Sequence, residues 1–246
     1  MDGRGKEGEE IMYNFDYVSK KQWKPIRDDL EKLIHRVQDE VRNDFTFSYR
    51  FIGSAARNMI TCDENTNIGF DFDVNLMVND TGELSAKEIR QMLMQAFNKF
   101  AEKYKYESAQ DGKRVFTIKV IEHKRAKIEH SCDFAIVKDY TDEAGKWYQE
   151  YIFFNKKQNK HEWQKQSSKF YELFEKEKWL KNNGFWNCVR STYLDKKNNN
   201  LDKNKKSCSL YAETINEVYN INKENEVYNK EAVSNIASGW YNVNIW

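Results

Sequence analysis

Two aspartates, Asp71 and Asp73, lie in a stretch in which apolar and polar residues alternate strictly from 70 to 78. That two-residue period predicts a half-buried strand. The two carboxylates then point to the same face, with their Cα atoms roughly 6.5 to 7 Å apart. They repel each other unless a cation lies between them, and a hard divalent ion such as Mg²⁺ suits carboxylate oxygens best.

A glycine-serine pair, Gly53 and Ser54, lies upstream of the acids at the end of an apolar stretch. It is expected to end a strand and open a short helix over 55–60, so that its backbone N–H groups point at an anion. Arg57 would then reach a phosphate, although a surface ion pair with Asp63 or Glu64 accounts for it equally well. A phosphate cradle beside an acid pair is typical of phosphoryl or nucleotidyl transfer.

The run Gly53-Ser54-Ala55-Ala56-Arg57, followed by the Asp71-x-Asp73 strand, resembles the DNA polymerase β-type nucleotidyltransferase superfamily. Small members of that superfamily carry Gly-Ser-x-Ala-Arg before an Asp-x-Asp-hydrophobic strand. The resemblance covers residues 1 to about 140. The chain departs from the pattern at Asn58, where small members often carry glycine, and in the loop 60–69, which is longer than in compact members.

The resemblance implies a third acid on a neighbouring strand, and Asp133 is the candidate. It lies in a predicted strand over 127–137, where alternation places it on one face with Ser131 and Ala135. Glu129 and Asp139 remain alternatives for this role.

The implied fold is of the α+β class: a mixed central sheet flanked by helices, followed by a helical C-terminal lobe. We expect a disordered N-terminus over 1–10, a catalytic domain over 11–155 and the helical lobe over 156–246.

The implied chemistry is the transfer of a nucleoside monophosphate from an NTP, with ATP favoured, to a hydroxyl acceptor, releasing pyrophosphate. Asp71 and Asp73 would bind two Mg²⁺ ions, with Mn²⁺ as a substitute, and Asp133 would bind one of the two. Gly53, Ser54 and Arg57 would bind the phosphates. The acceptor is expected to be a small molecule or a nucleotide, as in the bacterial cyclic oligonucleotide synthases and their cGAS and oligoadenylate synthase relatives. The alternative is a non-catalytic nucleotidyltransferase-like binding, antitoxin or regulatory protein.

The amino-acid composition limits the kinds of partner that are expected for this chain. The 40 basic and 39 acidic residues leave a formal net charge of +1, which disfavours a long nucleic acid as substrate. No apolar run is long enough to span a membrane, and the polar first ten residues do not form a signal, so a cytoplasmic location is expected. The four cysteines lack C-x-x-C spacing and should stay reduced, without zinc. The aromatic tail, with Trp240, Tyr241 and Trp246, could dock on the body or on another subunit, which leaves a homo-oligomer open.

The remaining periodicities predict the supporting elements. Helical spacing indicates a helix that begins after Ser19 or Asp28 and ends near residue 42, and another over 85–100. Alternation indicates strands over 45–52, 114–122 and 147–154. From His161 onward the pattern is interpreted as helical, with helices near 185–194 and 210–219 and a Lys/Asn loop over 195–206 between them. Aromatic stripes that include Phe174 are expected to form the core between these helices.

Overall fold

The computed structural model describes residues 13–63, 69–124, 127–202 and 204–240 of the chain, with side chains as far as residue 224. The chain divides into two compact units, one ending at Gln166 and the other beginning at Ser167. Each unit is described by itself.

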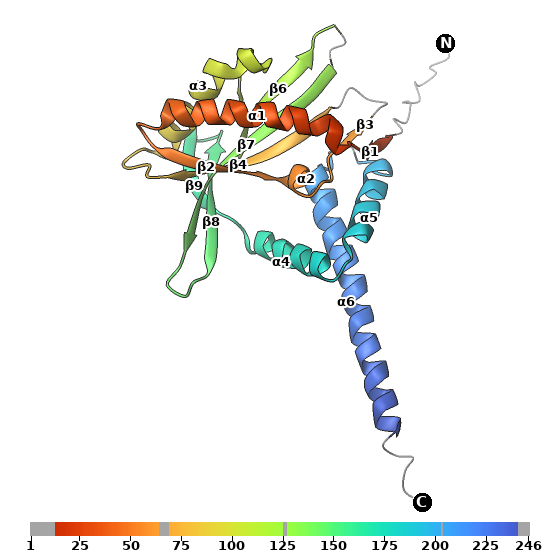
Figure 1. Cartoon of the computed structure of the whole chain (residues 1–246). Coiled ribbons are helices and arrows are strands. Elements are labelled where there is room, and N and C mark those ends of the chain that lie inside the picture. The colour runs from red at the N-terminus through yellow and green to blue at the C-terminus, as the bar shows by residue number, and fades with distance from the viewer. Residues whose placement is uncertain (1–12, 64–68, 125–126, 203, 241–246) are drawn as a thin grey trace, which may run out of the picture. The chain divides into compact units, whose positions relative to one another are not determined.

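A mixed seven-stranded sheet forms the centre of the first unit (Figure 1). Its main path runs β2 (Thr46–Ile52), β4 (Phe70–Asn79), β7 (Lys127–Thr141), β6 (Val115–Glu122) and β5 (Gln110–Asp111), while β8 (Trp147–Asn155) pairs with β7 and with β9 (Lys160–Lys165). The pairing of β4 with β7 is parallel, and the other pairings in this sheet are antiparallel. The predicted α+β class with a mixed central sheet is therefore confirmed.

Two long helices, α1 (Lys20–Val41) and α3 (Ala86–Ala101), pack against each other and cover one face of the sheet (Figure 1). Their buried residues, among them Leu33 and Phe97, join Phe72 and Phe134 of the sheet in one hydrophobic core. Both helices begin as predicted after a serine. Ser85 forms a capping box with Glu88: its Oγ accepts a hydrogen bond from the Glu88 N–H at 3.3 Å, and its own N–H donates one to Glu88 Oε2 at 2.8 Å.

Short elements complete the first unit. A single helical turn, α2 (Gly53–Ala56), connects β2 to the segment before β4, and η1 (Glu102–Tyr104) follows α3. A small separate sheet consists of β1 (Phe15–Tyr17) and β3 (Thr61–Asp63). The predicted helix over 55–60 is thus only one turn long and begins earlier, at Gly53.

The segment after β8 corrects one prediction. A helical pattern was expected from His161, but residues 160–165 form β9, which pairs with β8 from Asn155↔Lys160 to Glu150↔Lys165. The His161 ring stacks on Phe154 of the partner strand, with ring centroids 4.3 Å apart. Trp163 was interpreted as the start of a helical stripe, whereas it packs against the core of the sheet unit.

The second unit is helical, with α4 (Ser168–Asn182), α5 (Trp186–Asn198) and α6 (Ser207–Trp240). Its interior holds Leu180, Val189 and Ile215, each with no solvent exposure. Phe174, which was expected in this core, is 54% exposed, so that prediction is wrong. The expected loop over 195–206 is shorter, because α5 continues to Asn198. Tyr241 and Trp246 of the aromatic tail lie outside the described residues.

Among the described residues, none of the helices is both apolar enough and long enough to cross a membrane.

Candidate active site

Strand β4 places its aspartates on the face of the sheet opposite the helices. Phe72 and Val74 are fully buried in the core, whereas Asp71 is exposed and Asp73 is half-buried. This is the alternation that the sequence predicts, and it directs both carboxylates away from α1 and α3.

The parallel register of β4 and β7 brings the third acid to the pair. Asp73 lies directly opposite Asp133, and Asp71 lies opposite Ser131. Side chains at opposed positions of neighbouring strands point to the same face, and neighbouring strands are about 4.8 Å apart. Asp133 therefore lies beside Asp73 on the same face of the sheet.

The two alternative acids lie elsewhere on β7. Asp139 pairs in register with Gln149 of β8, and its carboxylate accepts a hydrogen bond from Gln149 Nε2 at 2.8 Å. Glu129 is an exposed residue four positions before Asp133. Neither is opposite Asp71 or Asp73 in the register.

Hydroxyl groups on the neighbouring strands hold two of the three carboxylates. Thr117 of β6 lies opposite Asp133, and its Oγ1 donates a hydrogen bond to Asp133 Oδ1 at 2.5 Å. The Oγ of Ser131 donates a hydrogen bond to Asp71 Oδ1. Sequence reasoning placed Ser131 on this face only as a small neighbour and did not single out Thr117. The only sign of Thr117 in the sequence is its position in a predicted strand. Its register with Asp133 could be known only from the structure.

Burial, together with the crowding of charge, raises the pKa of Asp73 to about 6, from an ordinary value of 3.8. Burial of the carboxyl group is the main cause, and the charges of Asp133 and Asp71 add to it. Arg57 acts in the opposite direction and lowers this pKa. The negative charge of Asp73, the central acid of the cluster, is therefore destabilised, and a nearby cation would stabilise it.

The turn at Gly53 packs directly on Asp73. Gly53 has a φ of +61°, and a Cβ placed on it would lie 2.0 Å from Asp73 Oδ2. Only glycine avoids both the strained backbone and the collision. The Ser54 carbonyl accepts hydrogen bonds from the N–H groups of Arg57 and Met59, at 3.2 and 2.8 Å, which closes the turn around α2. The structure thus brings Gly53 against the acids and sets Ser54 next to it in the same turn.

The departure from the family pattern at Asn58 has a local explanation. Asn58 has a φ of +54°, in the left-handed region that glycine adopts most readily and asparagine tolerates. Asparagine is therefore compatible with the backbone conformation of this turn. Glu64, one of the two alternative partners of Arg57, lies outside the described residues, as do residues 65–68 of the long loop.

The donor set fits a hard divalent cation in its chemistry. It consists of carboxylates alone, and burial and mutual repulsion raise the pKa of the central one. Within the described part of the chain, however, no three His, Cys, Asp or Glu side chains stand where they could hold one metal ion as they lie. The Oδ1 atoms of Asp71 and Asp133 each accept a hydrogen bond from a hydroxyl group.

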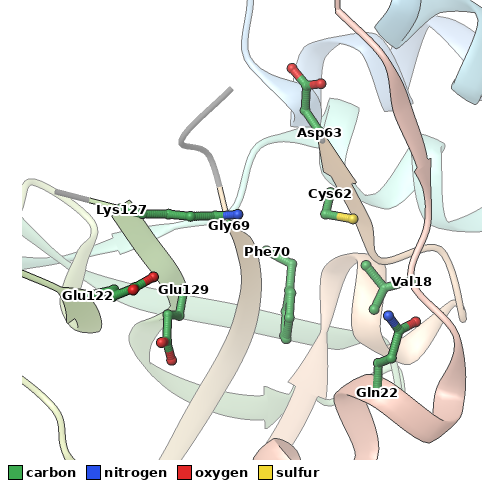
Figure 2. A pocket seen from close by; sticks show the side chains of 9 residues that line it. All are labelled: Val18, Gln22, Cys62, Asp63, Gly69, Phe70, Glu122, Lys127 and Glu129. Atoms are coloured by element: carbon green, nitrogen blue, oxygen red, sulfur yellow. The ribbon is translucent and has the colours of Figure 1, made fainter. Parts of the chain in front are cut away.

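A pocket of about 390 Å³ lies beyond the beginning of β4 (Figure 2). It is lined by Val18, Gln22, Cys62, Asp63, Gly69, Phe70, Glu122, Lys127 and Glu129. Three acidic residues and one lysine are among these residues, a balance that disfavours a triphosphate. Gly53, Ser54 and Arg57 are not among the residues that line it, so the phosphate-binding prediction stays with the turn at Gly53.

Comparisons with known proteins address the fold. No protein-family model matches the sequence, and no curated protein matches it either. Among solved structures, the chain is similar to the STING-associated CdnE c-di-GMP synthase from Capnocytophaga granulosa, with a TM-score of 0.50 and 16% identity over 82% of this chain and 61% of that one. It is also similar to the Rhodothermus marinus CdnE c-UMP-AMP synthase with Apcpp and Upnpp, with a TM-score of 0.50 and 11% identity over 82% of this chain and 72% of that one.

A third solved structure, the Bradyrhizobium diazoefficiens CD-NTase CdnG in complex with GTP, has a TM-score of 0.46 and 12% identity over 65% of this chain. This chain spans 42% of that protein's length. The chain has the nucleotidyltransferase fold. Its resemblance to the cyclic dinucleotide synthases, expected from the helical lobe that follows the catalytic sheet, is confirmed at the level of the fold by the two CdnE structures.

Proposed function

We propose that the chain is a metal-dependent nucleotidyltransferase that moves a nucleoside monophosphate from an NTP to a hydroxyl acceptor and releases pyrophosphate. The observation that carries this proposal is the register of β4 and β7, which sets Asp73 beside Asp133 on one face of the sheet. Asp71 lies two residues away on the same face of β4.

The proposed roles follow from position and charge. Asp71, Asp73 and Asp133 would hold Mg²⁺, or Mn²⁺ in its place. When bound, such ions neutralise the triphosphate and lower the pKa of the acceptor hydroxyl. The Gly53 backbone and the Ser54 hydroxyl would bind phosphate oxygens, because they lie in the turn that packs against Asp73. Arg57 would add a positive charge on the same side, consistent with its effect on the pKa of Asp73.

The proposed acceptor is a nucleotide hydroxyl or a small molecule. The two CdnE proteins that share the fold are described as c-di-GMP and c-UMP-AMP synthases, and one of them was solved with two nucleotide analogues. The near balance of 40 basic and 39 acidic residues supports a small acceptor rather than a long polynucleotide. ATP remains the favoured donor.

A second candidate is a nucleotidyltransferase-like protein that binds a nucleotide or a partner without catalysis. One observation favours it: in the part of the chain that the structure describes, no three potential ligands are arranged for a metal ion as they stand. Against it, all three carboxylates of the expected set are present on one face of the sheet.

The test is incubation of the protein with each NTP and Mg²⁺, with and without a second NTP, followed by mass analysis of the products. The proposal predicts pyrophosphate and a phosphodiester-linked or nucleotidylated product. Asp133→Asn should remove turnover. Asp139→Asn is the matched control, because that carboxylate lies on the same strand but bonds to Gln149. Binding of NTP without any product from the wild-type protein would favour the second candidate.

A further inference from the structure

Two hydroxyl groups reach the acidic cluster from positions that the strand register defines. Thr117 of β6 is the cross-strand partner of Asp133, and Ser131 of β7 is the cross-strand partner of Asp71. Each hydroxyl donates to its partner's Oδ1. The same relation thus occurs twice, on three successive strands of the sheet.

Register explains why these short side chains can reach the acids. Thr117 and Asp133 are opposed in an antiparallel pair, where Cβ atoms lie about 4.5 to 5.5 Å apart. Ser131 and Asp71 are opposed in a parallel pair, on strands about 4.8 Å apart. Both spacings are within reach of a threonine or serine hydroxyl. A shift of one residue would send the hydroxyl to the core face, where Ile118 and Cys132 are fully buried. The strand register therefore determines which hydroxyl group pairs with which carboxylate.

The hydroxyls act on the two outer members of the cluster. A hydrogen bond donated to a carboxylate limits its rotation. Asp71 and Asp133 receive such bonds, whereas Asp73 between them is packed against the Gly53 turn. A carboxylate offers about four lone-pair sites, so one hydrogen bond and one cation can share it.

We propose that Thr117 and Ser131 are positioning residues that orient Asp133 and Asp71 for a divalent cation at this cluster. This inference rests on the proposed function, because it assumes that the cluster binds a metal ion. The two residues act only through the aspartates that they orient. Partners of this kind typically affect metal affinity by roughly 10-fold to 100-fold.

Thr117→Val tests the role of the hydroxyl, because valine keeps the shape of threonine and is favoured in strands. Thr117→Ser is the rescue variant, since it keeps the hydroxyl. Thr46→Val is the matched control, because Thr46 is a strand residue opposite Asn79, at the other end of β4. Ser131→Ala, with Ser131→Thr as its rescue, tests the second pair independently should Thr117→Val fail to fold.

The first readout is calorimetric titration of nucleotide-free protein with MnCl₂, and the second is the Mg²⁺ concentration that gives half-maximal pyrophosphate release. We expect Thr117→Val and Ser131→Ala each to weaken Mn²⁺ binding by about 10-fold and to raise the Mg²⁺ requirement in parallel. Thr117→Ser, Ser131→Thr and Thr46→Val should stay within about twofold of the wild type.

Unchanged Mn²⁺ affinity in Thr117→Val and in Ser131→Ala overturns the inference, and so does a wild-type protein that binds no Mn²⁺. A wild-type protein that binds Mn²⁺ with the expected order among the variants, but releases no pyrophosphate, supports the positioning role and contradicts only the proposed function.

Discussion

At the scale of single residues, Asp73 carries an unfavourable charge in the folded protein. Its pKa of about 6 lies above the ordinary 3.8. Between these values the folded state binds more protons than the unfolded state, so the free energy of unfolding falls as pH rises from about 4 to about 6 and stays lower above it. The cluster thus reduces stability at neutral pH, as is common where charges are gathered for a function.

Asp73→Asn should therefore stabilise the metal-free protein. At pH 8 in the presence of a chelator, we expect the variant to gain about 1 to 3 kcal/mol in free energy of unfolding, because the buried charge is removed. Denaturant unfolding at pH 8 and pH 4 measures the effect. The difference in free energy of unfolding between the variant and the wild type should be smaller at pH 4. A variant that is less stable than the wild type at pH 8 would contradict the conclusion that the charge of Asp73 destabilises the folded protein. The same variant should have no nucleotidyl transfer.

Gly53→Ala should disable the site through a collision. The new Cβ would meet the Asp73 carboxylate, which must then move, and the positive φ adds strain of about 1 to 2 kcal/mol. We expect pyrophosphate release to fall at least about 100-fold, as displacement of a catalytic group by about 1 Å does. Gly82→Ala is the control, because Gly82 has a φ of +51° but nothing within 4 Å of its Cβ position. Equal activity of the two variants would contradict a role for the contact between Gly53 and Asp73.

At the scale of elements, the turn after α2 depends on a left-handed residue. Asn58→Gly should keep activity and change stability by less than about 0.5 kcal/mol, whereas Asn58→Val should lose about 1 to 2 kcal/mol, because a β-branched residue is strained at a φ of +54°. Thermal unfolding of both variants tests this. If Asn58→Val unfolds at the wild-type temperature, the left-handed conformation is not required.

A buried arginine joins α3 to the β5–β6 turn. Arg90 is 1% exposed, its Nε donates to Asp111 Oδ1 at 2.7 Å, and one guanidinium nitrogen donates to the carbonyls of Gly112 and Val115. These contacts fix the start of β6, the strand that carries Thr117.

Arg90→Met should lower the free energy of unfolding by about 3 kcal/mol, because it removes the hydrogen bonds that the guanidinium group donates to Asp111, Gly112 and Val115. The change should appear in denaturant unfolding, while the Mn²⁺ affinity of the folded protein changes by less than about twofold. Arg36→Met, at an exposed position on α1, is the control for the loss of a positive charge. If Arg90→Met is as stable as the wild type, the buried contacts of Arg90 make no net contribution to the free energy of unfolding.

At the scale of the whole molecule, sequence periodicity predicted the strands and helices around the acids. Alternation identified β4 and the face of Asp71 and Asp73, and helical spacing with serine caps identified α1 and α3. These are local signals, because the geometry of a strand or helix sets the spacing of the residues that share its buried side. Alternation also gave the face of Asp133 within its own strand.

What the sequence could not provide is pairing between distant strands. The placement of Asp133 opposite Asp73, and of Thr117 opposite Asp133, depends on register across β4, β7 and β6. β9 was mistaken for the start of a helix because its residues are only partly buried and do not alternate cleanly. The last helix was expected to end near residue 219, but α6 continues through a polar stretch to Trp240.

The most direct test of the central claim is a comparison of Mg²⁺-dependent pyrophosphate release from NTPs by the wild-type protein, Asp133→Asn and Asp139→Asn. We predict turnover by the wild type and by Asp139→Asn, and a loss of at least about 1,000-fold in Asp133→Asn, since the carboxylate beside Asp73 would then be gone. Undiminished release by a folded Asp133→Asn protein would contradict the account.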